Sequence, residues 1–152
     1  MAESGVWVRF IPRWVLLTFV LLPTLAAADA VDLTALKGKV VYLDFWASWC
    51  VPCRQSFPWM SGLQRNLEKD GLVVVAVNLD QVRADADGFL AEFKPPFRVA
   101  FDPQGGLAER FHVQGMPTSV LIGRDGQTRL VHQGFRSRDR EALEQQIRAA
   151  LR

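Results

Sequence analysis

Two cysteines three residues apart are the side chains of this sequence best suited to chemistry. Cys50 and Cys53 are the only cysteines in the chain, and a disulfide that closes so small a loop removes little entropy from the unfolded state. Domains stapled by disulfides usually carry four or more cysteines at wider spacing. The pair therefore indicates reversible thiol–disulfide exchange, in which one thiolate attacks a disulfide and a second thiol resolves the mixed disulfide.

The predicted surroundings of the pair favour this chemistry. The apolar run Val40–Trp46 predicts a strand buried on both faces, and Pro52 suits the first turn of a helix. Cys50 would then lie at the amino end of a helix, where unsatisfied N–H groups and the helix dipole favour a thiolate over a thiol. We expect Cys50 to be the exposed nucleophile and Cys53, one turn further along, to be the buried resolving thiol.

An aspartate and two histidines are the other candidates for chemistry. Asp44 lies inside the apolar run, where a buried unpaired charge is costly, so we expect a raised pKa and a role in moving protons. The alternative is a polar group that turns outward at the end of the strand. His112 and His132 lie far from the cysteines in sequence and are interpreted as surface or satisfied structural histidines, so no metal site is predicted.

The pattern of apolar residues and turns predicts an α/β fold. The elements expected after the first strand are a helix to about Asp70, a strand over 73–78, a helix over 84–93, a strand over 97–101, a short helix near 107–111, a strand over 118–122, its hairpin partner over 128–133 and a last helix capped by Ser137. This order predicts a central mixed sheet flanked by helices, mostly parallel, with an antiparallel hairpin at one edge.

The first 28 residues differ from the rest. Arg9 and Arg13 precede an apolar run from Trp14, and small residues follow at Ala26–Ala30, which is the pattern of a secretory signal peptide. The run from Trp14 to Ala28 has 15 residues, whereas a membrane span needs about 20. We therefore predict a signal peptide over 1–28 and one domain over 29–152. An uncleaved anchor, which would attach the protein to a membrane, is the alternative.

Length and charge narrow the classes of function. The chain has 152 residues, of which 49% are hydrophobic, enough for one domain with a proper core. The net charge is +2 with both signs interspersed, and no basic stripe indicates a nucleic-acid partner.

Two segments of the chain resemble the active site of thioredoxins. They are Asp44–Cys53, with its Trp-Cys-Val-Pro-Cys core, and Gly115–Thr118. Leu36–Val40 and Asp102-Pro103 further resemble the TlpA/ResA branch of extracytoplasmic thiol–disulfide oxidoreductases. The resemblance covers residues 32–152 and implies a thioredoxin fold with the central α/β insertion of that branch. The insertion would be the predicted helix and strand between residues 84 and 101.

The resemblance also implies roles for individual residues. Pro117 would be cis and face the cysteines, and Met116 would present its backbone to an extended substrate segment. The side chains expected to contact the substrate beside them are those of Trp49, Val51 and Pro52. Asp44 would lie beneath the second cysteine and help to move its proton.

One position departs from the family pattern. Many relatives carry a glutamate three residues after the second cysteine, where this chain has Ser56. No role of that glutamate can be transferred to this protein.

These observations predict a periplasmic protein disulfide reductase. It would act as a monomer without a cofactor other than its redox-active cysteine pair. A membrane thiol reductase would keep it reduced, and its clients would be exported cysteine-containing proteins, with apocytochrome c as one candidate. The alternatives are a net oxidant or isomerase, a copper-binding chaperone that uses the cysteines and a histidine, and a non-catalytic docking module.

Overall fold

The computed structural model describes Met1 and residues 31–152. Apart from Met1, the predicted signal peptide lies outside these residues. Within the described part of the chain, no helix is both long enough and apolar enough to cross a membrane.

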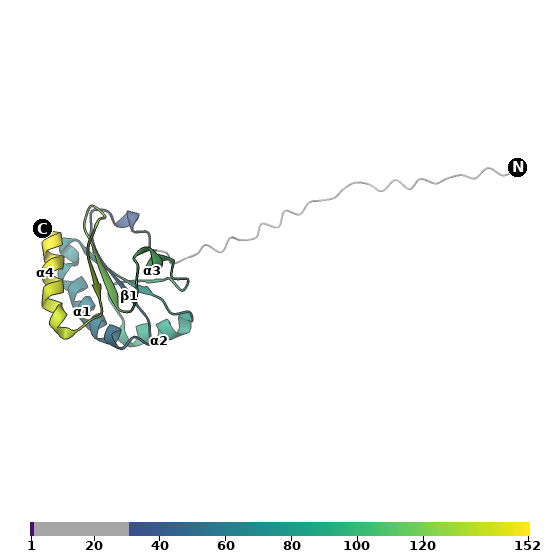
Figure 1. Ribbon diagram of the computed structural model, residues 1–152, viewed down its shortest axis with the longest axis horizontal. Helices are drawn as coiled ribbons and strands as arrows, with labels where there is room; N and C mark the ends of the chain where they lie inside the picture. The colour runs from purple at the N-terminus through teal and green to yellow at the C-terminus, as the bar shows by residue number, and fades with distance from the viewer. Residues whose placement is uncertain (2–30) are drawn as a thin grey trace.

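The core of the molecule is a five-stranded mixed sheet (Figure 1). Its strands are β1 (Val40–Trp46), β2 (Leu72–Asn78), β3 (Arg98–Phe101), β4 (Thr118–Ile122) and β5 (Thr128–Gln133), arranged in the order β3-β2-β1-β4-β5. β1, β2 and β3 are parallel, while β4 runs antiparallel to β1 and β5 antiparallel to β4. The sheet confirms the predicted fold class, including the antiparallel hairpin at one edge.

Helices cover both faces of this sheet. They are η1 (Thr34–Leu36), α1 (Val51–Leu67), η2 (Glu68–Asp70), α2 (Arg83–Phe93), α3 (Gly106–Arg110), η3 (Ser137–Asp139) and α4 (Arg140–Leu151). Buried side chains of α1, α2 and α4 pack on one face, and α3 and η1 pack on the other. In Figure 1, α1 and α4 lie side by side, with α3 across the sheet from them.

Successive side chains of β1 point to opposite faces of the sheet and so contribute to two separate parts of the core. Tyr42 and Trp46 point toward α1, whereas Leu43 and Phe45 point toward α3, because successive strand residues face opposite sides. All seven residues of β1 are buried, which explains why this strand reads as one continuous apolar run. The central strand thus brings its carboxyl end, and the loop that follows, to a fixed place beside α1.

An aromatic cluster fixes α1 on the sheet. The ring of Phe57 lies 4.8 Å from those of Trp46 and Phe89 and within 6 Å of those of Phe93 and Phe97. Edge-to-face pairs of this kind contribute about 0.5–1.5 kcal/mol each beyond burial. The inserted helix α2 therefore holds the helix that carries the cysteines.

The end of the first long helix and the start of the last helix differ from their predicted positions. The first helix ends at Leu67 and continues as the 3-10 turn η2 to Asp70, after which Gly71 adopts a left-handed φ of 100°. Ser137 does not cap the last helix, so that prediction was wrong. Instead, the Asp139 carboxylate accepts the Arg136 N–H at 2.9 Å and closes the turn η3, and α4 begins one residue later.

Candidate active site

The two cysteines form a disulfide across the first turn of α1. The S–S distance is 1.99 Å and the Cα atoms lie 5.3 Å apart. Cys50 is the N-cap residue, and the Cys53 backbone N–H donates to the Cys50 sulfur at 3.3 Å. In the reduced state the same N–H and the dipole of this 17-residue helix would stabilise a thiolate on Cys50.

Cys50 is less exposed than the sequence analysis predicted. Its exposed fraction is 3% and that of Cys53 is 0%, so the expected order holds, but neither residue is exposed in the disulfide form. Cys50 is bonded to the fully buried Cys53 and belongs with it to the core cluster on this face of the sheet. The neighbours Trp49 and Val51 project outward instead, with exposed fractions of 70% and 68%.

Asp44 is buried on the face of the sheet that carries the cysteines. It alternates with Tyr42 and Trp46 along β1, so its side chain points toward α1 and not outward. Burial raises its pKa to about 7, against a hydrogen bond from Ser119 that lowers it. The Ser119 hydroxyl donates to Asp44 Oδ1 at 2.6 Å. A carboxyl whose pKa is raised toward 7 can gain or lose a proton near neutral pH.

A second buried aspartate, which the sequence analysis missed, holds the loop before the cysteines. Asp80 follows β2, and its carboxylate accepts the Ser48 backbone N–H at 2.8 Å, the Ser48 hydroxyl at 3.1 Å and the Asn78 side-chain amide at 2.7 Å. The Leu79 N–H donates to the Trp46 carbonyl at 2.9 Å beside these bonds. The carboxyl ends of parallel strands meet at one edge of a sheet. An aspartate directly after β2 could therefore have been predicted to lie near the loop that follows β1.

The Met116–Pro117 segment lies at the same edge of the sheet. The peptide bond between these residues is cis, as the family resemblance implied. Thr118 pairs with Phe45 at the carboxyl end of β1, so Pro117 lies at the level of the loop that leads to Cys50. Pro117 is buried and Met116 is half-buried against the core cluster that includes both cysteines.

The other predicted positions are placed as follows. Pro52 is half-buried in the first turn of α1. Ser56 is buried, and its hydroxyl donates to the Cys53 carbonyl at 3.1 Å. His132 lies near Asp139, and His112 is exposed with a left-handed φ of 53°. Among residues 31–152, no three His, Cys, Asp or Glu side chains gather in a way that could hold a metal ion.

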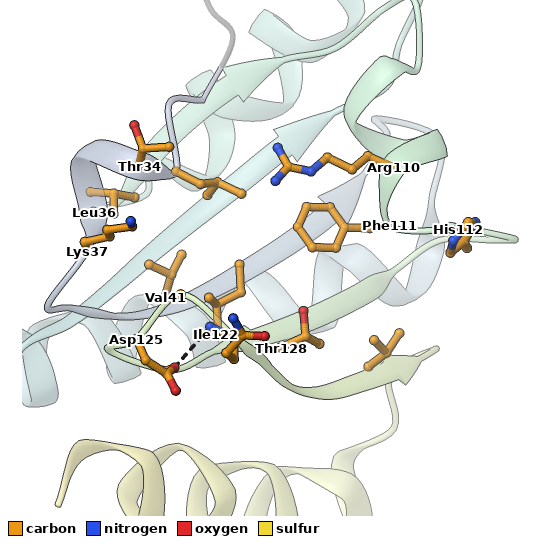
Figure 2. A pocket seen from close by; sticks show the side chains of 15 residues that line it. Thr34, Leu36, Lys37, Val41, Arg110, Phe111, His112, Ile122, Asp125 and Thr128 are labelled. Carbon is orange, nitrogen blue, oxygen red and sulfur yellow. Dashed lines mark hydrogen bonds between the residues drawn. The ribbon is translucent and has the colours of Figure 1, made fainter.

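A separate cavity of about 570 Å³ lies on the opposite face of the sheet. Figure 2 shows side chains from η1, from the end of α3 and from the β4–β5 hairpin around it. Val41 and Ile122, which belong to the core on the α3 side, contribute to its lining. The cavity is therefore distinct from the cysteine site, and none of the predicted site residues lines it.

Known proteins resemble this chain in sequence and in fold. A 36% identity over 112 residues, 74% of this chain, links it to the thiol-disulfide oxidoreductase ResA of Oceanobacillus iheyensis. A Chlorobium tepidum crystal structure, provisionally assigned as a thiol:disulfide interchange protein DsbE, is 57% identical, with a TM-score of 0.79 over 80% of this chain and 86% of that one. Bacillus subtilis StoA is 28% identical, with a TM-score of 0.63 over 72% of this chain and 83% of that one.

These matches define the fold and the family. The structural matches show that the mixed sheet and its helices form a thioredoxin-like fold. The chain spans a little over half the length of the curated relatives, 58% in the case of the Oceanobacillus protein. The sequence model of the Redoxin family matches residues 17–147, which is most of the chain, and this protein is therefore a member of the Redoxin family.

Proposed function

We propose that this protein is a thiol–disulfide oxidoreductase that reduces disulfides in other proteins through the Cys50–Cys53 pair. The observation that carries the proposal is the Cys50–Cys53 disulfide at the start of α1, with the buried carboxyl of Asp44 on the same face of the sheet. The relatives named as thiol-disulfide oxidoreductases support the same chemistry.

The first step is attack by Cys50. In the reduced protein the Cys50 thiolate forms a bond to one sulfur of the partner's disulfide, and the other partner sulfur leaves as a thiolate. Trp49 and Val51 offer exposed apolar surface on either side of this cysteine. We expect them, with Pro52 and the backbone of Met116, to hold an extended segment of the partner so that its disulfide lies against the Cys50 sulfur.

The second step releases the partner. The Cys53 thiol gives its proton to the Asp44 carboxylate, and the Cys53 sulfur then attacks the Cys50 sulfur. The bond between Cys50 and the partner breaks, the partner leaves as its second thiolate, and the disulfide of the present structure forms. Two electrons pass from the cysteine pair to the partner, and the one proton is left on Asp44.

The resemblance to extracytoplasmic relatives supports a proposal for the clients and the cellular setting. We place the protein in the periplasm after export, as a monomer with no cofactor beyond its cysteines. Its clients are exported cysteine-containing proteins, with apocytochrome c as one candidate, and a membrane thiol reductase returns electrons to the pair. A membrane contact of its own would require an uncleaved N-terminus.

Reduction of insulin by dithiothreitol tests the activity. The wild-type protein should accelerate precipitation of the insulin B chain, and Cys50→Ser should abolish the acceleration because no nucleophile remains at the helix start. Ser137→Ala, far from the cysteines in sequence, serves as the control and should retain full activity. Equal rates with wild type and Cys50→Ser would contradict the proposal.

The direction of electron flow is tested by the reduction potential of the pair. A value near the about −270 mV of thioredoxin would support a reductase, whereas one near the about −120 mV of DsbA would indicate an oxidant. Equilibration with glutathione redox buffers, read by tryptophan fluorescence, gives this value directly.

A further inference from the structure

Two hydrogen bonds hold the main chain on either side of Met116. The Thr118 hydroxyl donates to the Gly115 carbonyl at 2.6 Å. The Gly134 N–H, just after β5, donates to the Pro117 carbonyl at 2.7 Å. Thr118 has an exposed fraction of 3%, so little water competes for its hydroxyl. The carbonyls before and after that of Met116 are therefore both bonded within the protein.

The main chain of Met116 itself has no such partner. Within residues 31–152, neither its N–H nor its carbonyl makes a hydrogen bond, and the residue is half-buried. It lies two residues before β4, against the core cluster that contains both cysteines. Unpaired main-chain groups beside a strand can pair with an extended segment of another chain. Met116 thus offers one donor and one acceptor to a partner.

Thr118 sets the direction of the Met116 N–H. The Gly115 carbonyl and the Met116 N–H belong to one planar peptide group. This group is trans, since Met116–Pro117 is the one cis bond among the described residues, and in a trans peptide the carbonyl and the N–H point in opposite directions. Because the hydroxyl holds the carbonyl, the N–H points away from Thr118. Without the hydroxyl the peptide could rotate, and Gly115 would offer little resistance.

The Thr118 side chain acts from behind the segment and does not line the site. Thr118 lies directly opposite Phe45, so the two side chains point to the same face of the sheet. Phe45 belongs to the core on the α3 side, whereas Met116 packs with the cysteines on the α1 side. Thr118 can therefore influence a bound partner only through the peptide that it holds.

We propose that Thr118 is a positioning residue whose hydroxyl orients the Gly115–Met116 peptide, so that the Met116 N–H binds a main-chain carbonyl of the partner segment that carries the disulfide. This proposal rests on the proposed function. It assigns a class to the preferred substrate, which is a disulfide within an extended peptide segment. A disulfide without a peptide main chain should gain little from Thr118.

Two disulfides of different chemistry test this role. Reduced protein is mixed with an excess of a disulfide-bonded peptide or of 5,5′-dithiobis(2-nitrobenzoic acid), an aryl disulfide that has no peptide main chain. Mass spectrometry of acid-quenched samples follows oxidation of the cysteine pair. Measurements over a range of peptide concentrations separate the half-saturating concentration from the limiting rate. The wild-type protein should react with both compounds.

Thr118→Val removes the hydroxyl and keeps the branched shape of the side chain. Its half-saturating peptide concentration should rise about tenfold, which is about 1.4 kcal/mol and the size of one hydrogen bond. The limiting rate, and the rate with the aryl disulfide, should each change by less than about twofold, because binding of the segment is weakened and the chemistry of Cys50 is not. Thr118→Ser keeps a hydroxyl and should restore most of the peptide binding.

Ser61→Ala is the matched control. The Ser61 hydroxyl also donates to a main-chain carbonyl, that of Phe57 at 2.9 Å within α1, and Ser61 is buried. Its loss should lower stability in a similar way but leave the half-saturating peptide concentration unchanged. Thr118→Ala is measured beside Thr118→Val, and the rate of each variant with the aryl disulfide shows whether its cysteine site is folded.

An unchanged half-saturating peptide concentration in both Thr118→Val and Thr118→Ala would overturn the proposal. Equal losses with the peptide and the aryl disulfide, or peptide binding by Thr118→Ser as weak as that by Thr118→Val, would also overturn it. These outcomes leave the proposed function intact, because the wild-type protein still reduces both compounds. Failure of the wild-type protein to reduce the peptide would instead contradict the proposed function itself.

Discussion

Asp44 ties the stability of the protein to pH. Its pKa is raised from 3.8 to about 7 by burial, so the folded state holds a proton between these values that the unfolded state has released. Stability should therefore be greatest below about pH 4 as far as this group is concerned, and should fall as pH rises to about 7. The loss attributable to Asp44 is on the order of 4 kcal/mol.

Asp44→Asn should remove this dependence. The amide keeps an acceptor for the Ser119 hydroxyl but cannot ionise, so the oxidised variant should be more stable than wild type at pH 8 and similar to it at pH 4.5. Urea unfolding at the two pH values measures the difference. Asp102→Asn changes a carboxylate that caps α3 instead, and a rise in stability at pH 8 in that control would undermine the assignment.

The same Asp44→Asn change should slow disulfide exchange. Without a carboxylate to take the proton of Cys53, the resolving step should fall by about 100-fold, and the mixed disulfide should accumulate. Quenched-flow mass spectrometry of the reaction with an excess peptide disulfide would show this species. Unchanged kinetics with no accumulated adduct would mean that Asp44 is only a structural group.

Individual site residues were predictable where a residue type is uncommon in its surrounding element. Asp44 is a charged residue within an apolar strand, and Cys50 and Cys53 lie at the start of the helix that follows. The structure places all three on the face of the sheet that α1 covers. Ser119 was missed because its partner is fixed only by the pairing of β4 with β1. The exposure of Cys50 was mispredicted because a place at the start of a helix does not by itself make a sulfur accessible: Cys50 is bonded to the buried Cys53 and belongs to the same core cluster.

At the scale of elements, Asp80 connects the end of β2 to the loop before α1. Its bonds to the backbone and hydroxyl of Ser48 should fix the position of Trp49 and Cys50. Asp80→Ala should cost about 2 kcal/mol, as expected for buried hydrogen bonds to a charged group, and should also alter the rate at which iodoacetamide alkylates Cys50 in the reduced protein.

Asp102→Ala is the control that separates the loss of stability in Asp80→Ala from its effect on the alkylation of Cys50. Asp102 accepts the backbone N–H groups of Leu107 and Ala108 at 2.8 and 3.0 Å at the start of α3. Its loss should reduce stability to a similar degree but leave alkylation of Cys50 unchanged. Identical alkylation in Asp80→Ala and wild type would show that Asp80 does not position the cysteine.

Most elements could be predicted because their signals are local. Continuous apolar runs marked β1, β2 and β4, and Gly71 marked the end of the first helix region. Ser137 was assigned as a cap from its residue type alone, but a competing acceptor two residues later closes a 3-10 turn there. The hydrogen bonds between Asp80 and Ser48 could not be predicted from local sequence spacing, because the two residues are 32 positions apart.

At the scale of the whole molecule, Arg124 ties together segments at the end of the sheet opposite the cysteines. Its guanidinium donates to the carbonyls of Gly38, Asp70 and Leu151 at 2.8, 2.9 and 3.0 Å. Gly38 lies just before β1, whereas Cys50 lies beyond its other end. About 20 Å of strand therefore separates this group of contacts from the active site.

Arg124→Ala should lower the free energy of unfolding by about 1–2 kcal/mol and leave insulin reduction unchanged. Arg129→Ala is the control, because Arg129 makes an exposed ion pair with Asp125 that should be worth less than about 1 kcal/mol. Urea unfolding of both variants measures the contrast. An equal loss of unfolding free energy in the two variants would contradict the stabilising role of Arg124. A fall in insulin reduction with Arg124→Ala would contradict the separation of its contacts from the active site.

The overall architecture was the most predictable level. Strand and helix order predicted the mixed sheet with an antiparallel hairpin at one edge, and the resemblance to the TlpA/ResA branch implied the inserted helix and strand. The position of the inserted β3 at the other edge is known only from the structure. The hydrogen bond between Ser119 and Asp44 was not predictable in this way, since residues 44 and 119 meet only through the register of β1 and β4.

The covalent intermediate at Cys50 provides the most direct measurement of the central claim. Cys53→Ser, incubated in its reduced form with a peptide disulfide, should accumulate a mixed disulfide that peptide mapping by mass spectrometry locates on Cys50. Cys50→Ser should accumulate almost none, because Cys53 is fully buried. Adducts on Cys53 in Cys50→Ser to the same extent, or none on Cys50 in Cys53→Ser, would contradict the account.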